Sequence, residues 1–78
     1  MLNKNDIYKK YFIAFIDENG HGFKVGRIAE TTGDIEKFIN NKADHIIGAS
    51  VAKLFAINED CARRGAERLI REKQLVYL

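Results

Sequence analysis

The sequence predicts an α+β domain whose elements follow the order strand, strand, helix, helix, helix, strand. Two runs of aromatic and β-branched residues flank a glycine-bearing turn within residues 11–29, a pattern typical of a β-hairpin. Three later stretches, 31–42, 44–57 and 58–74, carry apolar residues at helical spacing. The last four residues, Leu-Val-Tyr-Leu, read as a short closing strand.

Length and composition indicate one globular domain over residues 1–78, with a hairpin in 1–30 and helices with a terminal strand in 31–78. The chain has 78 residues, of which 46% are hydrophobic and 31% are charged. Its single cysteine, Cys61, favours a reducing, intracellular setting. The N-terminus lacks the apolar run of a signal peptide, and no segment approaches the ~20 apolar residues of a membrane span. We therefore expect a cytoplasmic protein with no membrane partner.

The first strand of the predicted hairpin is apolar on both faces. Tyr11, Ile13 and Phe15 alternate with Phe12, Ala14 and Ile16. A strand of this kind is expected to be central in a sheet or covered on both sides. The glycines at positions 20, 22 and 26 do not have the spacing of a nucleotide-binding fingerprint, so turn and bulge are the better interpretation.

The first two helices are predicted from the helical spacing of their apolar residues. Residues 31–42 have Thr32 or Asp34 as the cap and an apolar stripe of Ile35, Phe38 and Ile39. Residues 44–57 are interpreted as a second helix. Its apolar positions are Ile46, Ile47, Val51, Leu54 and Phe55.

The third predicted helix holds most of the chain's arginines. Asn58 is its expected cap, and Glu59 and Asp60 suit the positive end of the helix dipole. Four of the five arginines of the chain lie between Arg63 and Arg71. The net charge is only +2, and all of this excess lies within residues 46–78. The location of the charge is therefore more informative than its size.

Catalytic and metal-binding patterns are not apparent in the sequence. The two histidines, His21 and His45, and the single Cys61 show no spacing typical of a metal site. Cys61 falls at an inward helix position, where an inert packed thiol is expected. We expect a non-enzymatic protein without cofactor or metal.

The stretch "SVAKLFAINEDCARRGAERLIREKQLV" resembles the helix-turn-helix core of winged-helix DNA-binding proteins, in particular GntR-like repressors, over residues 46–78. Val51, Leu54 and Phe55 match the first helix of that core, and residues 56–58 match its turn. Inward positions of the recognition helix correspond to Cys61, Ala62, Gly65, Ala66 and Leu69. Small residues at these positions would allow two helices to cross closely.

The resemblance implies a winged-helix-like fold, in which a three-helix core follows the hairpin, and a recognition helix of about 59–73 in the major groove of double-stranded DNA. Arg63 and Arg64 would lie nearest the bases, with Arg68 and Arg71 nearer the backbone. The protein would then act as a small transcriptional regulator. The expected DNA-contacting residues are Ser50, Lys53, Asn58, Arg63, Arg64, Glu67, Arg68 and Arg71.

Other interpretations of the same residues stay open. Acids at the start and bases at the end of a helix are also what dipole compensation on a solvated face produces. A protein-interaction module, such as a small inhibitor or adaptor using the hairpin edge, is the main alternative function. Structured RNA is a third partner class. A core this small contributes little stability, which is compatible with the formation of a homodimer.

Overall fold

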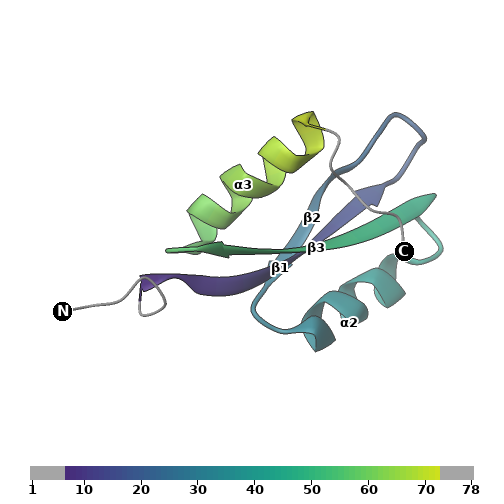
Figure 1. The fold of residues 1–78 in the computed structure, drawn as a ribbon. Coiled ribbons are helices and arrows are strands. Elements are labelled where there is room, and N and C mark those ends of the chain that lie inside the picture. The colour runs from purple at the N-terminus through teal and green to yellow at the C-terminus, as the bar shows by residue number, and fades with distance from the viewer. Residues whose placement is uncertain (1–6, 73–78) are drawn as a thin grey trace.

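The computed structural model describes residues 7–72 and contains a three-stranded antiparallel sheet with one helix on each face (Figure 1). The strands are β1 (Lys9–Asp17), β2 (Lys24–Ala29) and β3 (Gly48–Ala56). The helices are α2 (Thr32–Lys42) and α3 (Glu59–Arg71). The sheet order is β2-β1-β3, so β1 is the central strand and pairs with both of its neighbours.

The two faces of β1 belong to two separate apolar clusters. Tyr11, Ile13 and Phe15 pack with the buried face of α3. Ala14 lies on the other face and packs with Ile35 of α2. A strand that is apolar on both faces requires a layer on each side, and the two helices supply those layers.

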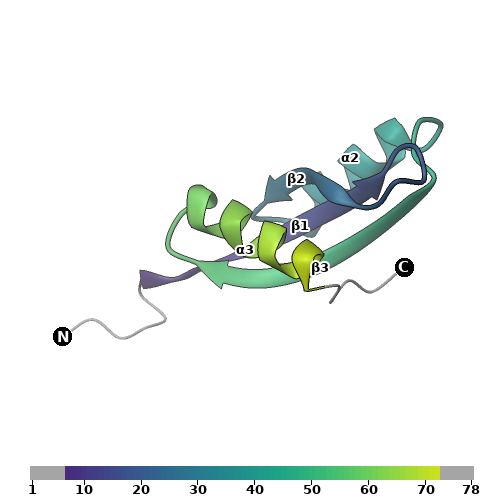
Figure 2. The same cartoon turned by 90° about the horizontal axis from the view of Figure 1, so that it is seen from above.

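The two helices are staggered along the sheet. Figures 1 and 2 show α3 across the middle of the sheet, whereas α2 lies on the opposite face near the end of β1. Each helix therefore covers only part of its face.

Local features of the hairpin follow from its polar and glycine residues. Asp17 accepts hydrogen bonds from the backbone N–H groups of Asn19 (3.2 Å) and Gly20 (2.7 Å), which begins the turn after β1. Gly20 has a φ of 79°, in the left-handed region that glycine adopts without steric cost. The β1–β2 register shifts between Ala14 and Phe15, opposite Gly26, which indicates a β-bulge at that glycine.

The predicted three-helix core is wrong, because the segment predicted as its second helix is a strand. Residues 48–56 form β3, which pairs with β1 along its whole length from Gly48 opposite Asp17 to Ala56 opposite Lys9. A short apolar run fits a helix and a buried strand almost equally well by periodicity alone. Here the pairing with β1, which lies over thirty positions earlier in the chain, decides the outcome.

Other predicted elements are present. The hairpin forms as β1 and β2, and two of the predicted helices correspond to α2 and α3. The cap of α2 is Thr31 rather than Thr32 or Asp34, because the Thr31 hydroxyl accepts the N–H of Asp34 at 3.2 Å.

The predicted closing strand at 75–78 lies outside the described residues. Within residues 7–72, no helix has the length and apolar character needed to cross a membrane.

Candidate functional site

Helix α3 carries most of the residues that the sequence predicts as a binding site. Its start is fixed by Asn58, whose Oδ1 atom accepts the backbone N–H of Cys61 at 2.9 Å. Glu59 and Asp60 occupy the first turn, whereas Arg68 and Arg71 occupy the last turn, so the charges complement the helix dipole. The predicted cap at Asn58 is confirmed.

The inner face of α3 meets the sheet through small residues in its first half and through larger ones near its end. Ala62 and Ala66 are fully buried, and the half-buried Leu69 and Ile70 extend the same face. Gly65 lies above Leu54 of β3, whose Cδ2 would be 3.3 Å from an added Cβ. The small residues therefore permit close approach to a sheet, whereas the sequence suggests a second helix as the neighbour.

The outer face of α3 presents the arginines to solvent. Arg63, Arg64, Arg68 and Arg71 are all exposed. Arg64, Arg68 and Arg71 follow an i, i+4, i+7 spacing and form a line along the helix, which we call the arginine stripe. This stripe lies opposite the buried Ala62–Ala66 face. The expectation that the guanidinium groups point outward agrees with the exposure of these residues.

The electrostatic balance of α3 is close to neutral. Its helical residues include four arginines and three carboxylates, and Glu67 is exposed among the arginines. Arg68 contacts Glu72 at 3.5 Å, but both side chains are well exposed, so this pair contributes little to stability. Within residues 7–72, Arg64 and Arg71 have no carboxylate within ion-pair distance. Two of the three cations of the stripe are thus open to an anion.

Three predicted contact residues do not join this surface. Ser50 is fully buried on the face of β3 that lies under α3, so it cannot reach a ligand in solution. Lys53 pairs with Phe12 across the sheet and lies on the opposite face. The Asn58 side chain already caps α3. The prediction of Ser50 and Lys53 assumes a helix at 48–56, and a strand with alternating side chains directs them elsewhere.

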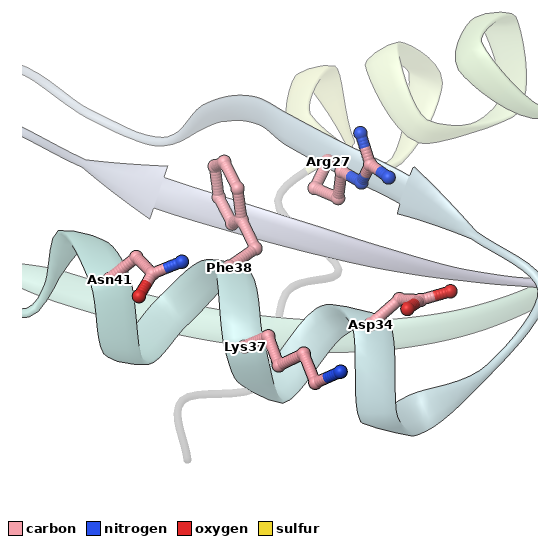
Figure 3. A pocket seen from close by; sticks show the side chains of 5 residues that line it. All are labelled: Arg27, Asp34, Lys37, Phe38 and Asn41. Atoms are coloured by element: carbon pink, nitrogen blue, oxygen red, sulfur yellow. The ribbon is translucent and has the colours of Figure 1, made fainter.

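An open hollow lies between β2 and α2. It is lined by Arg27, Asp34, Lys37, Phe38 and Asn41, and the polar ends of these side chains spread along the groove and do not converge on one point (Figure 3). Phe38 turns toward the strands, and its ring atoms would meet a Cβ at Gly26 at 2.8 and 3.0 Å. The aromatic ring thus fills the space above the glycine, and the hollow is open to solvent rather than enclosed.

Groups with catalytic or metal-binding chemistry are scattered over the structure. Cys61 is half-buried in the first turn of α3, and His21 and His45 are exposed in separate loops. Among residues 7–72, no group of three His, Cys, Asp or Glu side chains is placed to hold a metal ion.

A surface that the sequence does not indicate appears on the sheet itself. Phe55, expected on the inward side of a helix, is an exposed residue of β3 with 61% of its surface accessible. Lys10 lies directly opposite it on β1. The only sequence signal is the alternation of charged and aromatic residues in "KKYF" and "KLF", which is too short to distinguish from a helical pattern.

Comparisons with protein-family models, with curated proteins and with solved structures found no match to this chain. They leave the resemblance to winged-helix proteins untested, whereas the strand at Gly48–Ala56 corrects the fold that the resemblance implied.

Proposed function

We propose that the protein is a non-enzymatic DNA-binding protein that contacts the phosphate backbone of duplex DNA through the arginine stripe of α3. The single observation that carries this proposal is the exposed line of Arg64, Arg68 and Arg71 on the side of the helix opposite its buried face. Guanidinium groups are planar donors whose fork matches phosphate oxygens. The half-buried Cys61, which has no second cysteine in the chain to pair with, favours a cytoplasmic site of action.

The contact that we propose is directed at phosphates and is independent of DNA sequence. Base reading by Arg63 and Arg64 requires a recognition helix supported by a preceding helix, and that preceding segment is β3. Phosphate contacts position a protein on DNA without reading its sequence. Glu67 and the acids of the first turn weaken the attraction, so the affinity is expected to be modest and strongly dependent on salt.

The test is a salt titration of duplex binding with the triple variant Arg64→Gln/Arg68→Gln/Arg71→Gln. The slope of log K against log [salt] becomes shallower by about 0.9 for each phosphate that is no longer neutralised. We therefore expect weaker binding at low salt and a slope that is shallower by about 2 to 3. Fluorescence anisotropy of a labelled random-sequence duplex measures both quantities.

A matched control removes the same amount of charge elsewhere. The variant Lys24→Gln/Lys37→Gln/Lys42→Gln changes three lysines on β2 and α2 and leaves α3 unchanged. It should retain most of the duplex affinity. Equal weakening in both triple variants, or no change in the α3 variant, would refute the proposal.

The alternative function, a protein-interaction module, is favoured by the outer edges of the sheet. The hairpin contributes only the edge of β2, because β1 is paired on both sides. The nine-residue β3 forms the other edge, and no strand in residues 7–72 pairs with its outer side. A partner strand added to either edge would bind through main-chain hydrogen bonds. Such binding should respond little to salt, which separates it from DNA binding.

A further inference from the structure

Within the described residues, part of the sheet face that carries α2 has no helix over it. Figure 1 shows α2 near the end of β1, and no helix within residues 7–72 lies on this face near the start of β1. Four side chains alternate into this uncovered region. They are Lys10 and Phe12 of β1 and Lys53 and Phe55 of β3, which we call the sheet patch.

The register of the two strands arranges these four residues as alternating cations and rings. Lys10 lies opposite Phe55, and Phe12 lies opposite Lys53. Side chains directly opposite in an antiparallel pair share one face and are close neighbours. The Lys10 Nζ atom is 5.8 Å from the centre of the Phe12 ring, so the ammonium group lies beside an aromatic surface. Each ring of the patch therefore has a lysine beside it.

The aromatic residues of the patch differ in burial. Phe12 is half-buried and packs against the cluster under α2, which anchors the patch to the core. Phe55 has 61% of its surface exposed and belongs to neither core cluster. An exposed aromatic ring on a rigid paired strand offers a flat surface whose position is already fixed, so little conformational entropy is lost when a ligand stacks on it.

The charge of the patch is uniform, in contrast to that of α3. The residues of β1 and β3 that point to this face include Lys10 and Lys53 but no carboxylate. Within the described part of the chain, neither lysine forms an ion pair. Among the residues of these two strands, the rings therefore have only positively charged neighbours on this face.

We propose that the sheet patch binds a single-stranded polynucleotide, with a base stacked on Phe55 and neighbouring phosphates held by Lys10 and Lys53. Stacking requires an unpaired base, because a duplex hides the faces of its bases. Aromatic platforms flanked by cations are the common means by which proteins bind single strands without sequence preference. This site lies on the face of the sheet opposite α3, and it is independent of the duplex contact proposed above.

The same observations disfavour a second copy of the chain as the occupant. A symmetric contact between two sheet patches would bring four lysines into one interface, and like charges placed together oppose association. A polynucleotide supplies both an aromatic face and negative charge, which complement the two kinds of side chain present.

The test compares two substitutions of Phe55 in a titration with a labelled oligo(dT) of about 15 nucleotides. Phe55→Leu keeps an apolar side chain but removes the ring, and we expect binding to weaken by about 5-fold or more. Phe55→Tyr keeps the ring, and affinity should stay within about twofold of the parent. Because Phe55 is exposed, neither change disturbs the core; circular dichroism verifies the fold. Ile47→Ala removes another exposed apolar side chain, at the opposite end of β3, and should have no effect.

A second pair of variants tests the lysines. Lys10→Gln/Lys53→Gln should make the salt dependence of single-strand binding shallower, by about 0.7 for each phosphate that is no longer neutralised. Lys37→Gln/Lys42→Gln removes two lysines from α2 and should leave that slope unchanged. An oligo(U) of the same length presents the same chemistry on ribose, so weaker binding of either oligomer by Phe55→Leu supports the site, and binding of neither oligomer by the parent overturns it.

The outcomes are separable from those of the duplex experiment. In the background of the triple arginine variant of α3, Phe55→Leu should still weaken oligo(dT) binding, and Phe55→Leu alone should bind duplex DNA like the parent. Equal weakening by Phe55→Leu and Phe55→Tyr would overturn the stacking role. A dimer in sedimentation that dissociates in Phe55→Leu, with unchanged oligo(dT) affinity, would assign the patch to a second copy and also overturn the proposal.

Discussion

The two helices pack on the same sheet by opposite means. Among the buried residues under α3, the strand supplies the large Ile13 and Phe15, and the helix supplies the small Ala62 and Ala66. Among those under α2 the order is reversed, because Ile35 of the helix packs with Ala14 and Ala29 of the strands. In both layers large side chains meet small ones, which fills the space between the elements.

The exposed functional groups also differ between the two sides of the sheet. The outer face of α3, opposite Ala62 and Ala66, is exposed and carries the line of arginines. The helix α2 lies on the other face near the end of β1 (Figure 1), away from the start of β1, where Lys10 of the sheet patch lies. One face thus offers a cationic helix, and the other offers cations and rings on strands.

The largest expected effect compares the cores of the two layers. Phe15→Ala, on the α3 side, should lower the free energy of unfolding by about 4 kcal/mol, because it empties a fully buried site. Ile35→Ala, on the α2 side, should cost about 3 kcal/mol, since its side chain is smaller and its cluster holds fewer buried residues. Urea unfolding followed by circular dichroism measures both values. A greater destabilisation by Ile35→Ala would show that the α2 layer is the more important one.

A smaller effect compares the two glycines at which a helix and a strand meet. Gly26→Ala should lower the free energy of unfolding by about 1.5 kcal/mol, because the new Cβ lies 2.8 Å from a ring atom of Phe38 and 3.2 Å from Ile16 Cγ1. In Gly65→Ala the nearest contact is a Leu54 methyl at 3.3 Å, and the gain in helix propensity of up to about 1 kcal/mol opposes it. We expect that variant to be close to neutral by the same urea measurement.

A second substitution sharpens the comparison of the glycines. With Phe38→Leu as the background, the ring atoms that meet the new Cβ are absent, so most of the cost of Gly26→Ala should disappear. An unchanged cost in that background would locate the strain in the bulge or in the contact with Ile16, and not in the contact with Phe38.

The smallest expected effect compares the two N-caps. Asn58→Ala should destabilise the protein by about 1 kcal/mol, because it removes the 2.9 Å bond to the Cys61 N–H. Thr31→Ala should cost slightly less, about 0.7 kcal/mol, because its bond to the Asp34 N–H is longer, at 3.2 Å, and threonine is the weaker cap. Thermal unfolding of the two variants checks this order. Equal or reversed destabilisation by the two variants would mean that the length of the capping hydrogen bond does not determine how much each cap stabilises the protein.

The candidate site can be predicted from the sequence only where local signals are sufficient. Asn58, the acids after it and the regular spacing of Ala62 and Ala66 place α3 and its exposed arginines correctly. A helical interpretation of 44–57 assigns Ser50 and Lys53 to the same surface, and the strand places them on different faces. The exposure of Phe55 is not predicted for the same reason, because a helix would place this side chain on its inward face.

What the sequence determined by itself is therefore local: the hairpin, the two capped helices and the arginine content of the second one. Each depends on neighbours within a few residues, such as a cap, a turn or an i, i+4 spacing. Only the tertiary structure decided that residues 48–56 are a strand, because the hydrogen-bonding partner of that segment is the distant β1. The same pairing created the sheet patch by placing Lys10 beside Phe55, two residues that are brought together by backbone hydrogen bonds and not by proximity in the chain.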